Sequence, residues 1–169
     1  MRLAGQALQR AELPRVAAPL VSQLHQQTGH TAHLVIPSYD SVLCLAHAED
    51  GREAVPALRE LAPCHATAGG KALLSERRRW REAILNGTLE AVTAHTETHP
   101  DALRRELADT VARGYAIEAG EHTPGQDGVA AVVRTQTGEA VAAIAVTTHT
   151  IWTSARSDDR SPARRGRCP

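Results

Sequence analysis

The residues best suited to chemistry lie in one stretch, 63–75, where small residues run into an apolar helical pattern. This pattern predicts a helix that starts near Thr67. The first turn of a helix leaves backbone N–H groups unpaired and carries a partial positive charge, which favours a nearby anion. Small residues let a carboxylate approach those groups. We therefore expect the Thr67 hydroxyl and the amides of Ala68 and Gly69 to form a small-molecule site.

The same stretch also fits a purely structural role. Thr67 can cap the helix, and the glycines can let the helix pack closely against a sheet. Spacing alone does not decide between the two roles. Glu118 or Glu121 would lie near the helix start if the short strand at 115–118 borders it, and Lys71 would face either the site or solvent.

Three catalytic or nucleotide-binding motifs are not satisfied. Gly70 and Lys71 resemble part of a phosphate-binding loop, but its earlier glycine falls on His65 and its Ser/Thr falls on Ala72. No GxSxG occurs, which removes the main argument for a serine hydrolase. In segment 95–99 the glutamate is one place late for HExxH, and the following proline predicts a loop.

Two weaker alternatives remain open. Cys44, His47, Cys64 and His65 would form a metal site if strand-end and pre-helix residues converged, although no single spacing requires it. Cys64 and His65, together with Glu118, would be the candidates for a small hydrolase, but adjacent residues rarely point at each other. We expect binding rather than catalysis, with no catalytic residue, no metal and no cofactor.

Length and charge exclude several classes of protein. The 169 residues suffice for one ordinary domain. The 19 basic residues balance the 19 acidic ones, so the whole chain has no electrostatic reason to bind nucleic acid or a membrane. No run approaches the ~20 apolar residues of a membrane span. Three cysteines without CxxC spacing indicate a reducing compartment, and we expect a cytoplasmic protein.

Hydrophobic periodicity predicts an α+β fold, with a central antiparallel sheet and helices packed against it. Two hairpins are expected, one within 31–46 and the other within 129–146, and a short strand at 115–118. Segment 49–61 predicts a loop or a short strand. Helices are expected at 14–28, from Thr67 through 74, around 80–85, and from Pro100 to the glycine at 114.

The order of these motifs resembles the effector-binding domain of IclR-type bacterial transcriptional regulators. The matching segments are 17–20 with 28–29, 65–74, 114–121, 128–131, and 138 with 142–144, and the resemblance covers about residues 1 to 152. It implies a GAF-like or profilin-like sensor domain that binds a small organic effector and associates as dimers or tetramers. The effector contacts it implies are Thr67, Ala68, Gly69, Glu118, Gly128, Ala145 and Thr147.

Departures from the family pattern indicate which kind of ligand to expect, and the matching segments indicate where the domain begins and ends. Gly128 and Ala145 lack the side-chain donors of members that bind small oxo-acids, so we expect a roomier pocket for a larger, partly apolar or aromatic carboxylate. Residues 1–13 resemble the end of an interdomain linker, 14–152 the effector-binding domain, and 153–169 a disordered Arg-rich tail. DNA would be bound only through a winged helix-turn-helix absent from this chain; a stand-alone small-molecule or metal sensor is the alternative.

Overall fold

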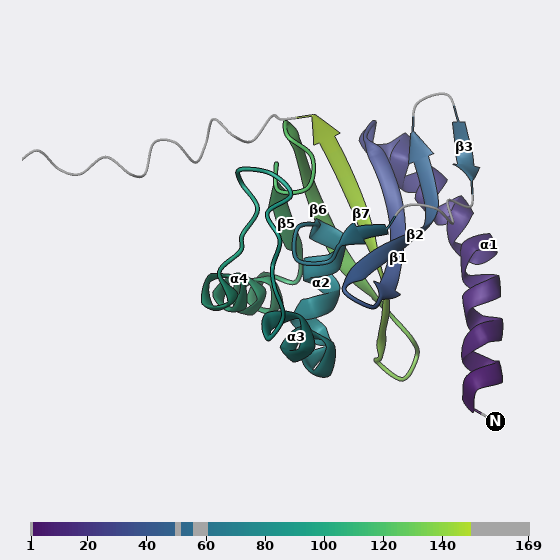
Figure 1. Ribbon diagram of the computed structural model, residues 1–169. Helices are drawn as coiled ribbons and strands as arrows, with labels where there is room; N and C mark the ends of the chain where they lie inside the picture. The colour runs from purple at the N-terminus through teal and green to yellow at the C-terminus, as the bar shows by residue number, and fades with distance from the viewer. Residues whose placement is uncertain (1, 50–51, 56–60, 150–169) are drawn as a thin grey trace, which may run out of the picture.

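One antiparallel sheet forms the centre of the molecule (Figure 1). The computed structural model describes residues 2–49, 52–55 and 61–149, and the expected tail at 153–169 lies outside them. The strand order is β3-β2-β1-β7-β6-β5, with β4 paired to β2. The strands are β1 (Thr31–Ser38), β2 (Ser41–Glu49), β3 (Arg52–Val55), β4 (Leu61–Pro63), β5 (Ala116–Ala119), β6 (Gln126–Arg134) and β7 (Ala140–His149).

The two predicted hairpins are confirmed, and the sheet joins them. β1 and β2 form the first, with a turn in which Tyr39 adopts a left-handed φ of 55°. β6 and β7 form the second, and Gly138 in its connection has a φ of 83°. β7 then pairs antiparallel with β1, so strands from the two ends of the chain lie at the middle of the sheet. The predicted α+β class with a central antiparallel sheet is therefore confirmed.

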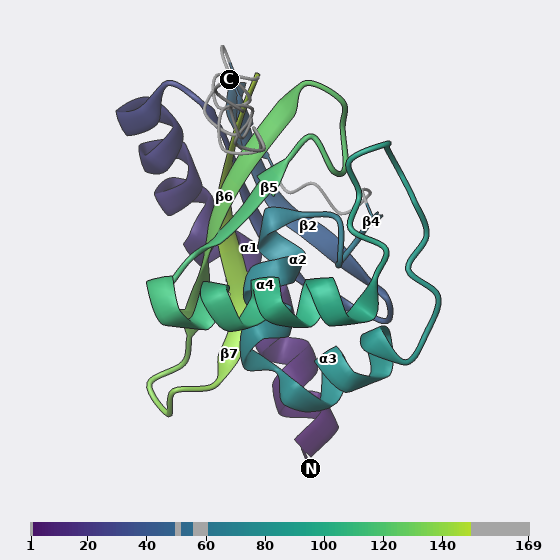
Figure 2. The same cartoon turned by 90° about the vertical axis from the view of Figure 1, so that its left-hand side faces the viewer.

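Helices cover both faces of the sheet. α1 (Arg2–Thr28) packs on one face, while α2 (Ala68–Glu76), α3 (Arg78–Leu85) and α4 (Pro100–Arg113) lie on the other (Figure 2). α4 begins with proline at its first position and ends at Gly114, whose φ of 85° suits a left-handed C-cap, as the sequence predicts. The molecule therefore has three layers: α1, the sheet, and the α2–α4 group.

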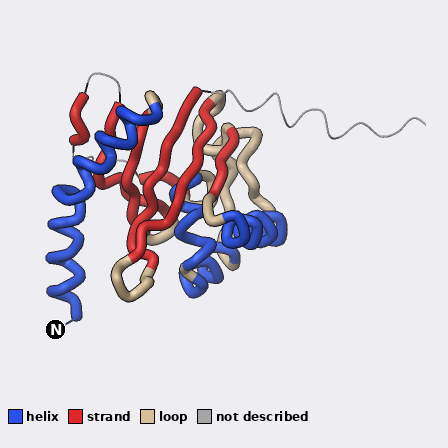
Figure 3. Tube along the Cα trace, turned by 180° about the vertical axis from the view of Figure 1, so that it is seen from behind, coloured by secondary structure: helices blue, strands red, loops and turns tan. Residues whose placement is uncertain are grey.

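The first helix is longer than the sequence predicts. It begins at Arg2 rather than Pro14, and both Pro14 and Pro19 lie inside it. An interior proline lacks the N–H for the helical hydrogen bond and bends the axis. The helix changes direction partway along its length (Figure 3). The interior position of Pro14 therefore excludes a helix start there, and the change of direction is what interior prolines produce.

Small residues bring α2 very close to the sheet. Every residue of α2 from Ala68 to Ser75 is buried, which is the pattern of a helix enclosed on all sides. A Cβ added at Gly70 would overlap the backbone of Cys64, and one added at Gly69 would lie 2.6 Å from Val35 Cγ2. The glycines are therefore required for close packing, and α2 is fixed beneath the strands that carry the expected site.

Candidate functional site

The expected cap at the start of α2 is present. Thr67 has an extended backbone, and its Oγ1 accepts a hydrogen bond of 3.2 Å from the N–H of Gly70. The same hydroxyl donates to the carbonyl of Pro63 at 3.3 Å. Its structural role is therefore confirmed, because both bonds hold the helix start in place. At the same end of the helix, the backbone N–H of Ala68 interacts with the carboxyl group of Glu118.

Four of the expected contact residues meet at one point on the sheet. Glu118 on β5 is the register partner of Gly128 on β6, which is in turn the partner of Thr147 on β7. A Cβ built on Gly128 would lie 3.3 Å from Glu118 Oε2, 3.3 Å from Thr147 Cγ2 and 3.5 Å from the Cβ of Ala68. The structure thus brings together a helix start, a carboxyl group, a hydroxyl group and a bare strand position.

Besides the capping residue Thr67, the other two expected contact residues border this point without joining it. Ala145 lies on β7 two residues before Thr147, pairs with Ala130, and is buried. Gly69 lies against Val35 and supports the approach of the helix. We will call Ala68, Glu118, Gly128 and Thr147 the helix-start site.

Glu118 is the most perturbed group in the helix-start site. It is 5 % exposed, and the N–H of His122 donates to its Oε1 at 3.1 Å. Its pKa is raised to about 7, mainly by burial, and the nearby charge of Glu121 also raises it. The N–H groups of His122 and Ala68 and the charge of Lys71 favour the ionised form and lower the pKa, but they do not offset the effect of burial. Both protonation states of Glu118 are therefore populated at neutral pH.

Two histidines that the sequence did not single out for this site form a row that ends at Thr147. His33 on β1 and His47 on β2 are register partners, and their Nδ1 atoms lie 3.2 Å apart. His33 Nε2 lies 3.1 Å from Thr147 Oγ1, and His47 Nε2 lies 3.3 Å from Glu49 Oε2. Burial and the neighbouring His47 lower the pKa of His33 to about 4, so this ring is uncharged at neutral pH. A continuous polar row thus reaches the site from the first hairpin.

A β-bulge explains why this pair is hidden in the sequence. Ser38 pairs with Ser41 across the turn, and an unbroken hairpin would place His33 opposite Ala46. The register shifts between Leu34 and Val35, so His33 faces His47 instead. No residue type marks that bulge in the sequence.

A surface hollow of about 240 Å³ adjoins the end of this row. It is lined by residues that include His30, Thr31, Glu49 and Thr147. A second hollow of about 390 Å³, lined by residues that include Arg77, Arg79, Trp80 and Arg134, lies between the α2–α3 junction and the β6–β7 connection. Thr147 is the one residue of the helix-start site that lines the first hollow, and none of the four lines the second.

The sequence left open whether Lys71 faces the site or solvent, and in the structure it does not face solvent. Its side chain is completely buried, and its Nζ lies 2.6 Å from Glu121 Oε2 and 2.9 Å from Glu106 Oε1. Glu121 therefore lies near α2, as expected for this short-strand region, and it pairs with the lysine rather than facing Gly128.

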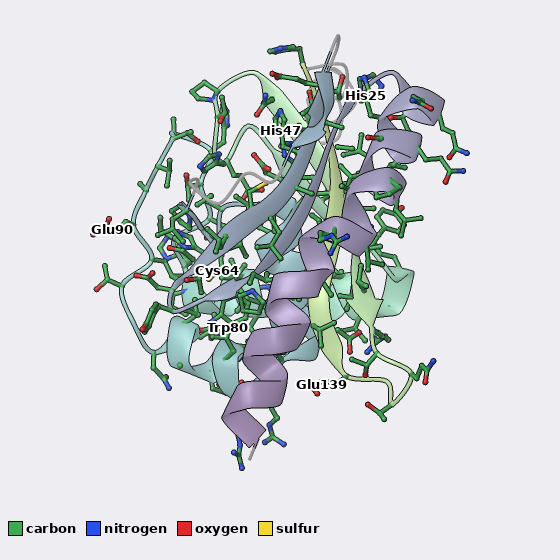
Figure 4. All side chains as sticks on the ribbon, turned by 90° about the vertical axis from the view of Figure 1, so that its right-hand side faces the viewer. His25, His47, Cys64, Trp80, Glu90 and Glu139 are labelled. Atoms are coloured by element: carbon green, nitrogen blue, oxygen red, sulfur yellow. The ribbon has the colours of Figure 1, made fainter. Side chains whose placement is uncertain are left out.

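The metal and hydrolase alternatives find no support in the geometry. Within residues 2–49, 52–55 and 61–149, no group of three or more His, Cys, Asp or Glu side chains could hold a metal ion. His47 and Cys64 lie well apart (Figure 4). Burial raises the pKa of Cys64 to about 12, so its thiol is protonated and a poor nucleophile. His65 Nε2 contacts the carbonyl of Glu90 at 3.0 Å.

Known proteins similar to this chain identify its family. Residues 5–161 match the family described as bacterial transcriptional regulator IclR C-terminal. The HTH-type transcriptional regulator BhcR of Paracoccus denitrificans (strain Pd 1222) is 37% identical over 149 residues, covering 85% of this chain and 53% of that protein. The chain therefore spans about half the length of this curated relative.

Two solved structures that contain aromatic acids are similar to this chain. The inducer-binding domain of PobR from Acinetobacter, in complex with 3-hydroxybenzoic acid, superposes with a TM-score of 0.71 and 28% identity, over 81% of this chain and 83% of that chain. An IclR homologue from Microbacterium hydrocarbonoxydans, complexed with 4-hydroxybenzoate, superposes with a TM-score of 0.74 and 28% identity, over 88% of this chain and 64% of that chain.

The fold and these similarities identify the class of protein as the effector-binding domain of a bacterial transcriptional regulator. The chain belongs to the IclR family, whose C-terminal domain it matches along most of its length. Among the described helices, none is both long and apolar enough to cross a bilayer.

Proposed function

We propose that this domain binds a small, partly apolar or aromatic organic acid at the helix-start site and thereby adjusts DNA binding by the regulator to which it belongs. The observation that carries the proposal is the meeting of the α2 N-terminus with Glu118, Gly128 and Thr147. The helix start attracts a carboxylate, and Gly128 and Ala145 bring no polar side chain to the bound acid. The two hydroxybenzoate complexes of similar proteins support the ligand class.

Glu118 should make ligand binding depend on protonation. The backbone N–H of Ala68 already interacts with the Glu118 carboxylate, so a ligand carboxylate at the same amide meets a second carboxyl group. Two carboxylates in close contact repel each other, whereas one that keeps a proton can donate a hydrogen bond to the other. We expect ligand binding to be accompanied by proton uptake and to weaken as the pH rises above about 7, the pKa of Glu118.

A thermal-shift and calorimetric screen of organic acids tests the function. The panel comprises benzoate, 3-hydroxybenzoate and 4-hydroxybenzoate with glyoxylate and pyruvate as small oxo-acids. An acid present at 100 times its Kd adds about 2.7 kcal/mol to the free energy of unfolding. Tight binding of glyoxylate or pyruvate, with none of the aromatic acids, would contradict the ligand class, and no shift with any acid would contradict the function.

Matched glycine variants locate the site. Gly128→Val places methyl groups against Glu118, Thr147 and Ala68, and we expect it to abolish the response to the acid that wild type binds. Gly87→Ala adds a Cβ at ordinary contact distance on the surface, away from the site, and should leave the response intact. An unchanged response in a folded Gly128→Val protein would place the ligand elsewhere.

The remaining expectations about the whole regulator stay proposals. We propose that dimers or tetramers form, that DNA is contacted through another domain, that the protein acts without enzymatic turnover in the cytoplasm, and that 14–152 delimit the sensor domain, with 1–13 belonging to a linker. Coupling requires only that the acid bind two subunit arrangements with different affinity. Sedimentation with and without the acid identified in the screen measures whether the association state changes.

A further inference from the structure

Four side chains form a hydrogen-bonded row across three strands, which we call the histidine relay: Glu49, His47, His33 and Thr147. The successive distances are 3.3 Å from Glu49 Oε2 to His47 Nε2, 3.2 Å between the Nδ1 atoms, and 3.1 Å from His33 Nε2 to Thr147 Oγ1. Each histidine uses both ring nitrogens in the row. The proton positions are therefore not independent of one another.

With His47 uncharged, the relay has a single consistent direction. An ionised carboxylate only accepts, so His47 Nε2 carries the proton that faces Glu49. His47 Nδ1 is then an acceptor and must receive the proton of His33 Nδ1. His33 Nε2 is an acceptor in turn, and Thr147 donates its hydroxyl proton to it. The remaining lone pairs of Thr147 Oγ1 can only accept.

With His47 protonated, every bond in the relay reverses except the first. His47 Nδ1 now donates to His33 Nδ1, so the proton of uncharged His33 sits on Nε2. His33 Nε2 donates to Thr147, and the hydroxyl proton of Thr147 is released to another acceptor. The low pKa of His33 is consistent with both arrangements, since the His33 ring is uncharged in each.

We propose that Thr147 selects the end of the effector remote from its carboxylate, and that the charge on His47 decides whether Thr147 accepts or donates there. The proposal rests on the function proposed above, because Thr147 is part of the helix-start site. With His47 uncharged, the site takes an acid that carries a hydroxyl or another N–H or O–H donor. With His47 charged, the same position takes an ether or carbonyl oxygen.

The surroundings of His47 identify the groups that influence its charge. Among the described residues, Glu49 faces it from its own strand and His33 faces it from β1. Its partner on β3 is Val55, an uncharged residue type. The hollow beside Glu49 and Thr147 is also lined by His25, His30 and His149.

Paired ligands measure the proposal directly. Calorimetry compares 4-hydroxybenzoate with its methyl ether, and 3-hydroxybenzoate with its methyl ether, at about pH 8 and about pH 5.5, on either side of the ordinary histidine pKa of about 6.5. The ratio of the two Kd values within a pair cancels the effect of Glu118, which acts on both carboxylates alike. We expect the hydroxyl compound of the better-fitting pair to bind about tenfold more tightly at the higher pH. At the lower pH this preference should vanish.

Two variants separate the relay from the rest of the site. Thr147→Val keeps the shape of the side chain and should remove the preference at both pH values. His47→Leu removes the ring whose charge sets the direction of the relay in this proposal, and the preference should no longer change with pH. If an acid binds but wild type shows no preference, or the variants leave preference and pH response unchanged, the relay proposal is overturned while the proposed function stands.

A second measurement needs no ligand. Two-bond ¹H–¹⁵N spectra of the free protein report which nitrogen of His33 carries the proton. We expect Nδ1 at about pH 8 and Nε2 at about pH 5.5, the two sides of the ordinary histidine pKa. A proton that stays on Nε2 at both pH values would overturn the relay, whatever the ligand screen shows. If no acid binds while the tautomer does switch, only the proposed function and the role of Thr147 in it fail.

Discussion

Lys71 Nζ lies 2.6 Å from Glu121 Oε2, and the lysine side chain is completely buried. A second carboxylate, Glu106 on α4, accepts from the same Nζ at 2.9 Å. Burial raises the pKa of Glu121, Lys71 opposes that effect, and Glu106 adds to it. One ammonium group thus ties α2 both to α4 and to the connection between β5 and β6. Its loss would leave carboxylates facing each other in the interior.

Lys71→Met should destabilise the protein strongly. Removing one partner of a buried ion pair leaves an uncompensated charge, which costs about 3–5 kcal/mol. Urea unfolding at about pH 8, well above the ordinary glutamate pKa of about 4.3, measures the loss. The double variant Lys71→Met, Glu121→Gln should recover part of it, because an uncharged amide then replaces the Glu121 carboxylate and only that of Glu106 is left without the lysine. A single variant as stable as wild type would show that the pair contributes nothing net.

Glu118→Gln should weaken the dependence of stability on pH. The pKa of Glu118 is about 7 in the folded protein against an ordinary 4.5, so the folded state binds its proton more tightly. Stability therefore falls as pH rises from about 4.5 to about 7, by at most about 3 kcal/mol. The glutamine protein should be about 1–3 kcal/mol more stable than wild type at pH 8 and similar near pH 4.5.

Urea titrations across that pH range compare Glu118→Gln with Glu139→Gln, which alters an exposed glutamate. Glu121 also has a raised pKa, so part of the pH dependence should remain in the first variant. Parallel curves for Glu118→Gln and wild type would mean that burial does not hold the proton on Glu118.

Gly70→Ala should cost at least about 2 kcal/mol, the range found for overpacked interiors. The added Cβ would overlap the backbone of Cys64, which cannot rotate away as a side chain can. Gly87→Ala is the control, because its Cβ would lie at ordinary contact distance from the carbonyl oxygens of Ile84, at 3.4 Å, and Ala83, at 3.7 Å. Thermal and urea unfolding of the two variants should differ clearly; equal stabilities would mean that α2 can move off the strand.

Gly69→Ala should destabilise the protein for a different reason, and a second change should relieve it. Here the obstacle is Val35 Cγ2, 2.6 Å from the built Cβ, and this atom belongs to a side chain. Val35→Ala removes that atom, so the double variant should be more stable than the sum of the two single changes. Additive losses in a double-mutant cycle would indicate that the two residues do not touch.

Most of the elements follow from local patterns, and the site follows only in part. The Thr67 cap, the Pro100 helix start and the hairpins can be predicted because each depends on residues adjacent in the chain. The first helix could not be bounded, since Pro14 normally marks a start and here lies inside. Nor does apolar character alone mark its buried face: Val21 is buried, whereas Val16 and Leu20 are exposed.

Contacts between distant segments explain the remaining differences. Lys71 meets Glu121 and Glu106 only because α2 lies between α4 and the β5–β6 connection. His33 meets His47 only because a bulge shifts the register of the first hairpin. Neither pairing has a periodic signal in the sequence. The residue types were visible, but their partners depended on how the layers stack.

Because α2 lies so close to the strands, substitutions at their contact can add side-chain atoms but have almost none to remove. Gly69, Gly70, Ala68 and Gly128 have little or no side chain to lose, and the spaces that a Cβ would need at the glycines are already filled. Sequence drift at this contact can therefore add atoms but hardly remove them. A change of ligand preference is accordingly easier to reach through the polar residues of β1, β2 and β7, where shorter side chains can enlarge the site without forcing the helix away.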